Sequence, residues 1–272
     1  MTAEVAFAIG LVLAAVPLAA VLVAQRRRLK RLSAQCEAQV TDLQRLQESC
    51  ARLAPGNVVD QLVVDGDTSA TAERKEVTAL FADLVGYTAL SERLDPPVLA
   101  RVLNGYFQSM SDAIGTYRGH VSTFIGDGLL AYFGALEPNP WQSDDAVHAA
   151  LAMREALAAY NTELRAEGLP QLSFGVGIHR GVGLAGWVGS RDRMEYSFVG
   201  RTVNVAARVQ ALTRSYDVDV LATESVAVHL DPRFRLRPMQ AASLKGIELP
   251  VATFAVLGLA ADGGAGARAP LR

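Results

Sequence analysis

An uncharged, apolar run stands near the start of the chain. Residues 5–24 contain no charged side chain, and about 20 such residues form a helix that crosses a hydrocarbon core of roughly 30 Å. Five basic residues follow within positions 26–31, and membrane proteins keep such charge on the cytoplasmic side. We therefore predict a single-pass anchor over residues 1–25 in the inner or plasma membrane, with the rest of the chain cytoplasmic. A cleaved signal peptide is the alternative, but it places positive charge before its apolar run, where this chain has only Glu4.

The pattern then changes to a repeat of seven. One register holds Leu29, Cys36, Leu43 and Cys50, and the other holds Leu32, Gln39, Leu46 and Leu53. These are the core positions of a heptad array, so we predict a juxtamembrane coiled coil over residues 26–54. One amphipathic helix that packs on its own domain is the alternative. Proline at position 55 cannot continue a helix, and residues 55–74 are predicted to form a connector.

From residue 75 to residue 257 the pattern indicates a mixed domain. Apolar, β-rich runs predict strands, and apolar positions at helical spacing predict helices. The strands are expected at 77–82, 119–125, 129–133, 172–178, 182–188, 194–199 and 251–256, and the helices at 97–117, 146–164 and 202–212. This order predicts an α+β fold with one sheet and several helices. The Gly/Ala-rich residues 258–272 are predicted to form a disordered tail.

The composition argues against nucleic-acid binding and against a metal site made of cysteines. Half of the residues are hydrophobic and the formal net charge is only −2, which argues against a general affinity for nucleic acid. The two cysteines, Cys36 and Cys50, cannot form a metal-ligand set. Whether they crosslink is left open.

Two carboxylates stand at suggestive positions. Asp83 ends a predicted buried strand, and Asp127 lies between two glycines at the tip of a predicted hairpin. A charge beside a buried core needs a partner, often a metal ion, and two carboxylates that hold two metals suit phosphoryl or nucleotidyl transfer. A plain turn-forming aspartate is the alternative for Asp127.

Three further polar residues extend this set. Asn204 and Arg208 lie one turn apart on a predicted helix, where an amide and a guanidinium could hold a sugar oxygen and a phosphate. Lys245 precedes a glycine and could reach another phosphate. A helix-start asparagine and a solvated arginine are the structural alternative.

Four separated segments, in the order 77–92, 124–134, 193–208 and 244–251, resemble the class III adenylate/guanylate cyclase catalytic domain. The resemblance covers about residues 74–257. It implies a ferredoxin-like α+β fold and a head-to-tail homodimer with its sites at the interface. It also implies attack of a ribose 3′-hydroxyl on the α-phosphorus, with release of pyrophosphate.

The resemblance also assigns roles to individual positions. Asp83, Asp127 and the backbone carbonyl of Leu84 match the ligands of two Mg²⁺ or Mn²⁺ ions. Asn204 and Arg208 match the pair that orients the ribose and stabilises the transition state from the opposite protomer. Lys245 matches the lysine that contacts the terminal phosphates.

The base-reading positions depart from the family pattern. Thr123 stands where many members carry lysine, and Ser197 stands where aspartate or threonine is common. A hydroxyl pair reads a base without charge assistance, so discrimination should be weaker. Guanylate cyclases typically present a carboxylate in place of the lysine, and Thr123 does not. We therefore expect a membrane-anchored adenylate cyclase acting on ATP; a guanylate cyclase, or a degenerate cyclase domain that regulates a partner, is the alternative.

Overall fold

The computed structural model describes residues 73–189, 194–243 and 250–260. The predicted anchor, the coiled coil and most of the connector lie outside these residues, as does Lys245. Within the described part of the chain, no helix combines the length and apolar character needed to cross a bilayer.

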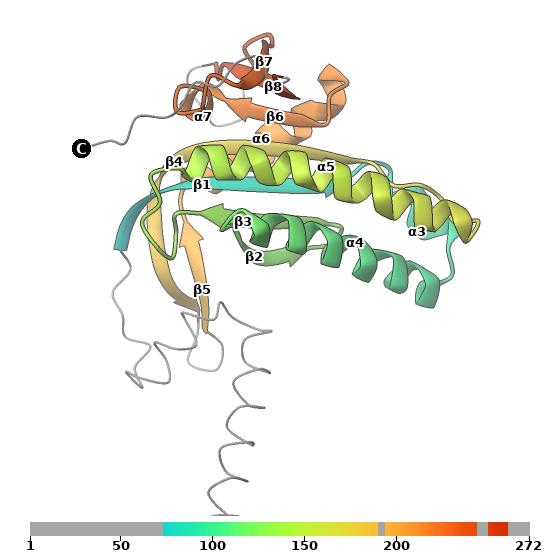
Figure 1. The fold of residues 1–272 in the computed structure, drawn as a ribbon. Helices are drawn as coiled ribbons and strands as arrows, with labels where there is room; N and C mark the ends of the chain where they lie inside the picture. Colours follow the sequence, from blue (N-terminus) through green and yellow to red (C-terminus); the bar gives the residue numbers. More distant parts are fainter. Residues whose placement is uncertain (1–72, 190–193, 244–249, 261–272) are drawn as a thin grey trace, which may run out of the picture. The chain divides into compact units, whose positions relative to one another are not determined.

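One sheet organises the described residues (Figure 1). Its strands run in the order β2-β3-β1-β4-β6-β8-β7, and β5 pairs with the outer part of β4. Neighbouring strands are antiparallel, except that β4 and β6 are parallel. The bounds are β1 Glu73–Leu84, β2 His120–Ile125, β3 Gly128–Phe133, β4 Phe174–Gly189, β5 Met194–Val199, β6 Val220–Thr223, β7 Phe234–Pro238 and β8 Thr253–Leu259.

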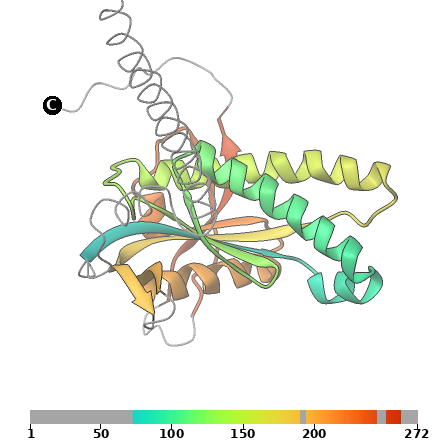
Figure 2. The ribbon, with the colours of Figure 1, turned by 90° about the horizontal axis from the view of Figure 1, so that it is seen from below.

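Helices cover both faces of this sheet. Figure 2 shows α4 and α5 on one face and α6 on the other. The bounds are α3 Tyr87–Arg93, α4 Pro96–Thr116, α5 Gln142–Ala166, α6 Arg201–Tyr216 and α7 Glu224–Ala227. The predicted α+β fold, with one sheet and several helices, is therefore confirmed for the described residues.

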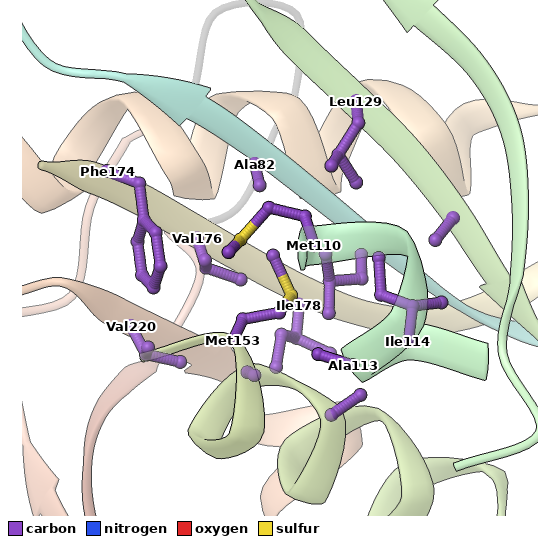
Figure 3. Packing of buried hydrophobic residues seen from close by; sticks show 14 of the residues in the cluster. Ala82, Met110, Ala113, Ile114, Leu129, Met153, Phe174, Val176, Ile178 and Val220 are labelled. Carbon is purple, nitrogen blue, oxygen red and sulfur yellow. The ribbon is translucent and has the colours of Figure 1, made fainter. Parts of the chain in front are cut away.

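Strand alternation assigns the central strand to two packed layers. Leu80, Ala82 and Leu84 belong to the large core under α4 and α5, where Met110 and Met153 meet Ile178 (Figure 3). Val77 and Ala79 belong to the smaller core on the α6 side. Because successive side chains of a strand point to opposite faces, Asp83 lies on the α6 side of the sheet.

Helix α6 packs directly on the backbone of β4. A Cβ added at Gly177 would overlap the backbone nitrogen of Gln210 and the carbonyl of Ala206. Only glycine permits this approach of helix to strand. It fixes α6, which carries Asn204 and Arg208, against the sheet.

The structure corrects the prediction of two strands at 172–178 and 182–188. Strand β4 is continuous from Phe174 to Gly189, because the polar residues between the two runs find partners. The imidazole Nδ1 of His179 lies 2.9 Å from the Thr223 hydroxyl, and Arg180 donates to the Glu76 carboxylate at 2.8 Å. Burial, with the charge of Arg201 adding to it, lowers the pKa of His179 to about 4, so its ring is neutral at pH 7.

Smaller corrections concern element ends. Helix α3, which buries none of its residues, lies between the predicted strand at 77–82 and the predicted helix at 97–117, where no element was predicted. Strand β1 already begins at Glu73, in the predicted connector. Strand β8 continues to Leu259, into the predicted tail, because it pairs with β7.

Candidate active site

Asp83 and Asp127 meet at one end of the central strand. Ala82, the neighbour of Asp83 on β1, pairs with Leu129 of β3, and Asp127 occupies the turn between β2 and β3. A Cβ added at Gly128 would lie only 3.1 Å from Oδ1 of Asp83 and 3.0 Å from the Ala82 carbonyl. The glycine therefore lets the hairpin tip touch the Asp83 carboxylate, which sets Asp127 beside it.

The electrostatics agree with two facing carboxylates. Burial raises the pKa of Asp83, and the nearby carboxylate of Asp127 raises it further, whereas Arg214 lowers it. Tyr106 of α4, in the core near them, is fully buried, and its hydroxyl has no hydrogen-bond partner among the described residues. Burial raises the pKa of that phenol, and the charges of Asp83 and Asp127 add to the effect. Two like charges at the edge of a core favour a bound cation.

A residue that the sequence reasoning missed lies at this point. Nη2 of Arg214 donates to Oδ2 of Asp83 at 3.1 Å and to the carbonyl of Leu84 at 3.0 Å. Arg214 is the basic residue in the last turn of α6. Basic side chains are common there because they complement the helix dipole, so its position in the sequence does not mark Arg214 as a site residue.

The donor set fits a hard divalent cation. Two carboxylates and one backbone carbonyl are the oxygen ligands that Mg²⁺ accepts, with water and substrate phosphates filling its other positions. The described residues contain no group of three or more His, Cys, Asp or Glu side chains that could hold a metal by themselves. Asp83, Asp127 and the Leu84 carbonyl could hold Mg²⁺ or Mn²⁺ in the presence of a phosphate-bearing ligand.

Asn204 and Arg208 are not brought to these carboxylates within one chain. No hydrogen bond or ion pair among the described residues joins either side chain to Asp83 or Asp127. Asn204 is exposed and lies ten residues before Arg214, which is about 15 Å along the helix axis at 1.5 Å per residue. The predicted catalytic pair and the predicted metal ligands therefore form two separate half-sites on one chain.

Thr123 and Ser197 lie on strands that Tyr132 connects. The Tyr132 hydroxyl donates to the carbonyl of Phe198, next to Ser197, at 3.3 Å. Burial raises the pKa of Tyr132 to about 12, and a hydrogen bond with Ser122, next to Thr123, opposes the shift. The structure brings the two strands together at Tyr132, but it shows no hydrogen bond between Thr123 and Ser197.

Comparison with known proteins identifies this arrangement. The model of the adenylate and guanylate cyclase catalytic domain matches residues 70–258. The chain belongs to this family. The family relationship inferred from the four sequence segments is therefore confirmed.

Relatives of both nucleotide preferences are similar to this cyclase domain. The chain is 34% identical to an adenylate cyclase of Anabaena cylindrica over 73% of its own length and 40% of the relative. It is also 34% identical to adenylate cyclase 1 of Rhizobium meliloti, over 69% of its own length and 28% of the relative. The chain thus spans less than half the length of these curated relatives.

Two solved structures share the fold. The adenylyl cyclase CyaB from P. aeruginosa superposes with a TM-score of 0.66 at 28% identity, covering 71% of this chain and 100% of that one. The guanylyl cyclase Cya2 superposes with a TM-score of 0.66 at 31% identity, covering 71% of this chain and 96% of that one.

Proposed function

We propose that the chain is an adenylate cyclase that converts ATP to 3′,5′-cyclic AMP and pyrophosphate. The observation that carries the proposal is the meeting of Asp83, Asp127 and the Leu84 carbonyl at the end of β1. The adenylate cyclases among its relatives support the choice of reaction. In this reaction the ribose 3′-oxygen bonds to the α-phosphorus, the bond to the leaving pyrophosphate breaks, and the hydroxyl proton passes to solvent.

Some of the proposed site residues supply charge, and others position the substrate. Two Mg²⁺ or Mn²⁺ ions, when bound, would lower the pKa of the 3′-hydroxyl and neutralise phosphate charge. Asp83 and Asp127 supply the negative charge that holds them. Arg208 supplies a fixed guanidinium for the charge that develops on the α-phosphate, and Asn204 hydrogen-bonds to the ribose. Lys245, outside the described residues, is proposed to contact the terminal phosphates.

The two half-sites support a homodimer. Asn204 lies about 15 Å along α6 from the residue that touches Asp83, and no described contact joins Asn204 or Arg208 to Asp83, so we infer that a second copy completes the site. Exposed apolar side chains gather on the outer part of β4 and on β5: Val182 is 44%, Leu184 49% and Val199 50% exposed, and Leu184 pairs with Val199 across the two strands. Apolar side chains grouped in this way are typical of interfaces.

Competition between ATP and GTP tests the proposal that the chain is an adenylate cyclase. Thr123 and Ser197 carry hydroxyls rather than a lysine and a carboxylate, so selectivity is expected to be modest. With equal ATP and GTP and with Mn²⁺ or Mg²⁺, we expect the purified chain to form more cyclic AMP than cyclic GMP, measured by chromatography. A predominance of cyclic GMP indicates a guanylate cyclase, which the similarity to Cya2 makes the second candidate. No product with either metal from a verified dimer contradicts cyclase activity.

We also propose that residues 1–25 anchor the chain in the membrane, with the catalytic domain in the cytoplasm. The support is the uncharged run at 5–24 and the basic block after it. Tethering raises the effective concentration of the partner protomer. The full chain should sediment with membranes, resist extraction by high salt and dissolve in detergent. A chain that salt releases contradicts the anchor.

A further inference from the structure

Arg214 has no role in the proposed reaction, yet it contacts two of the three predicted metal ligands. One nitrogen, Nη2, lies 3.1 Å from Oδ2 of Asp83 and 3.0 Å from the Leu84 carbonyl. Both oxygens are predicted metal ligands. A cation that bridges the two oxygens must take the place in which this nitrogen lies.

The guanidinium and a metal ion cannot share this place. Arginine keeps its positive charge in proteins, so loss of a proton cannot remove its repulsion of a metal ion. Two cations within a few ångströms of each other repel strongly where water is partly excluded. The side chain is still free to move, because it is 53% exposed. Metal binding therefore requires the guanidinium to swing away.

A neighbouring cavity offers a place for it. The cavity has a volume of about 680 Å³, and its lining includes Arg214, Val85, Asp217 and Asp219. Asp219 is already held by Arg154 through two hydrogen bonds of 2.5 and 2.8 Å. The Asp217 side chain makes no hydrogen bond or ion pair within the described part of the chain. It lies three positions after Arg214, just beyond the end of α6, and lines the same cavity as Arg214.

We propose that Arg214 is the resident cation of the metal site. It pairs with the Asp83 carboxylate when no metal is bound, exchanges its place with the incoming ion by turning toward Asp217, and so sets the metal concentration at which the site fills. The proposal deepens the proposed function, on which it rests for the identity of the metal-dependent reaction. The exchange itself depends on Asp83, Leu84 and Arg214, with Asp217 as the second partner of the guanidinium, and not on turnover of a nucleotide.

The direct test is a titration of the purified full chain with Mn²⁺ in the absence of nucleotide. The electron paramagnetic resonance signal of free Mn²⁺ measures how much of the ion is bound. Arg214→Gln should lower the Kd for Mn²⁺ about tenfold, equivalent to about 1.4 kcal/mol, because the competing cation is gone. Arg214→Lys, which keeps a charge that can reach the same oxygens, should stay close to the wild type. Arg101→Gln is the matched control, because Arg101 is an exposed arginine of α4 that pairs with Glu167 at 2.7 Å.

A second variant tests the destination of the guanidinium. Asp217 has a left-handed backbone with φ of 50°, which asparagine adopts readily, so Asp217→Asn should fold. It should weaken Mn²⁺ binding by about threefold, as expected for loss of an exposed ion pair. Unchanged Mn²⁺ binding by Asp217→Asn contradicts the role of Asp217 as the partner of the displaced Arg214 guanidinium.

Mn²⁺ binding by Arg214→Gln that is no tighter than by the wild type overturns the exchange. The outcome is separable from the proposed function. Tighter binding without cyclic nucleotide formation supports the exchange and contradicts only the cyclase reaction. Cyclic nucleotide formation with unchanged Mn²⁺ binding in the Arg214→Gln variant supports the cyclase reaction and contradicts the exchange.

Discussion

Replacing Asp83 by asparagine is expected to reduce cyclic nucleotide formation by about a hundred- to a thousandfold, the size of effect seen when a group that stabilises transition-state charge is removed. The substitution keeps the shape of the side chain but removes the charge that holds the metal. The domain should remain folded, because the Asp83 side chain is 26% exposed and the change relieves repulsion from Asp127, whose carboxylate raises the pKa of Asp83. Initial rates with ATP and Mn²⁺ measure the effect.

The control for this variant is Asp112→Asn. Asp112 is an exposed aspartate of α4 that accepts a hydrogen bond from Gln108, and its loss should leave the rate unchanged. Circular dichroism and thermal melting without metal should show that the Asp83 variant is as stable as the wild type or more so. A folded Asp83→Asn protein with a rate near that of the wild type contradicts the metal assignment.

Mixing two inactive variants is expected to restore activity. Asp83→Asn breaks the metal half of the site and Arg208→Ala breaks the other half, so each homodimer should be inactive. When equal amounts of the two chains exchange subunits, half of the dimers are mixed, and each mixed dimer has one intact site of two. About one quarter of the wild-type activity should therefore return, as the two-fold symmetry of a homodimer requires.

The matched control combines two defects in the same half of the site. Asp83→Asn mixed with Asp127→Asn leaves every site with a damaged metal half, so no activity should return. Rates are measured after the chains have been mixed and dimers confirmed by sedimentation. Failure of the first mixture to recover, with mixed dimers present, shows that Asp83 and Arg208 do not form one site across two chains.

The sequence predicted the parts of the fold that local pattern determines. The apolar run before Asp83 and the glycines around Asp127 indicated a strand and a hairpin, and both are present. The break predicted within β4 was wrong because His179 and Arg180 find polar partners on strands distant in sequence. Helix α3 was missed because a short helix with no buried residue shows no apolar periodicity.

The sequence predicted some residues of the candidate site and not others. Asp83 and Asp127 could be named from their positions at a strand end and a hairpin tip, and the structure brings them together. Arg214 could not be named, because its contact with Asp83 spans 131 positions and depends on how α6 crosses the sheet. The separation of Asn204 from Asp83 along α6 also follows from this packing and not from spacing in the sequence.

The backbone contact between α6 and β4 limits how activity can be controlled. Because Ala206 and Gln210 rest directly on Gly177, the helix cannot slide or roll without steric overlap, and Asn204 and Arg208 are fixed in the frame of their own domain. In the proposed dimer, their separation from the partner's Asp83 can then change only when one whole domain turns against the other. A two-fold axis makes that turn identical at both sites. The two catalytic centres should therefore open and close in step, through a single angle between rigid bodies.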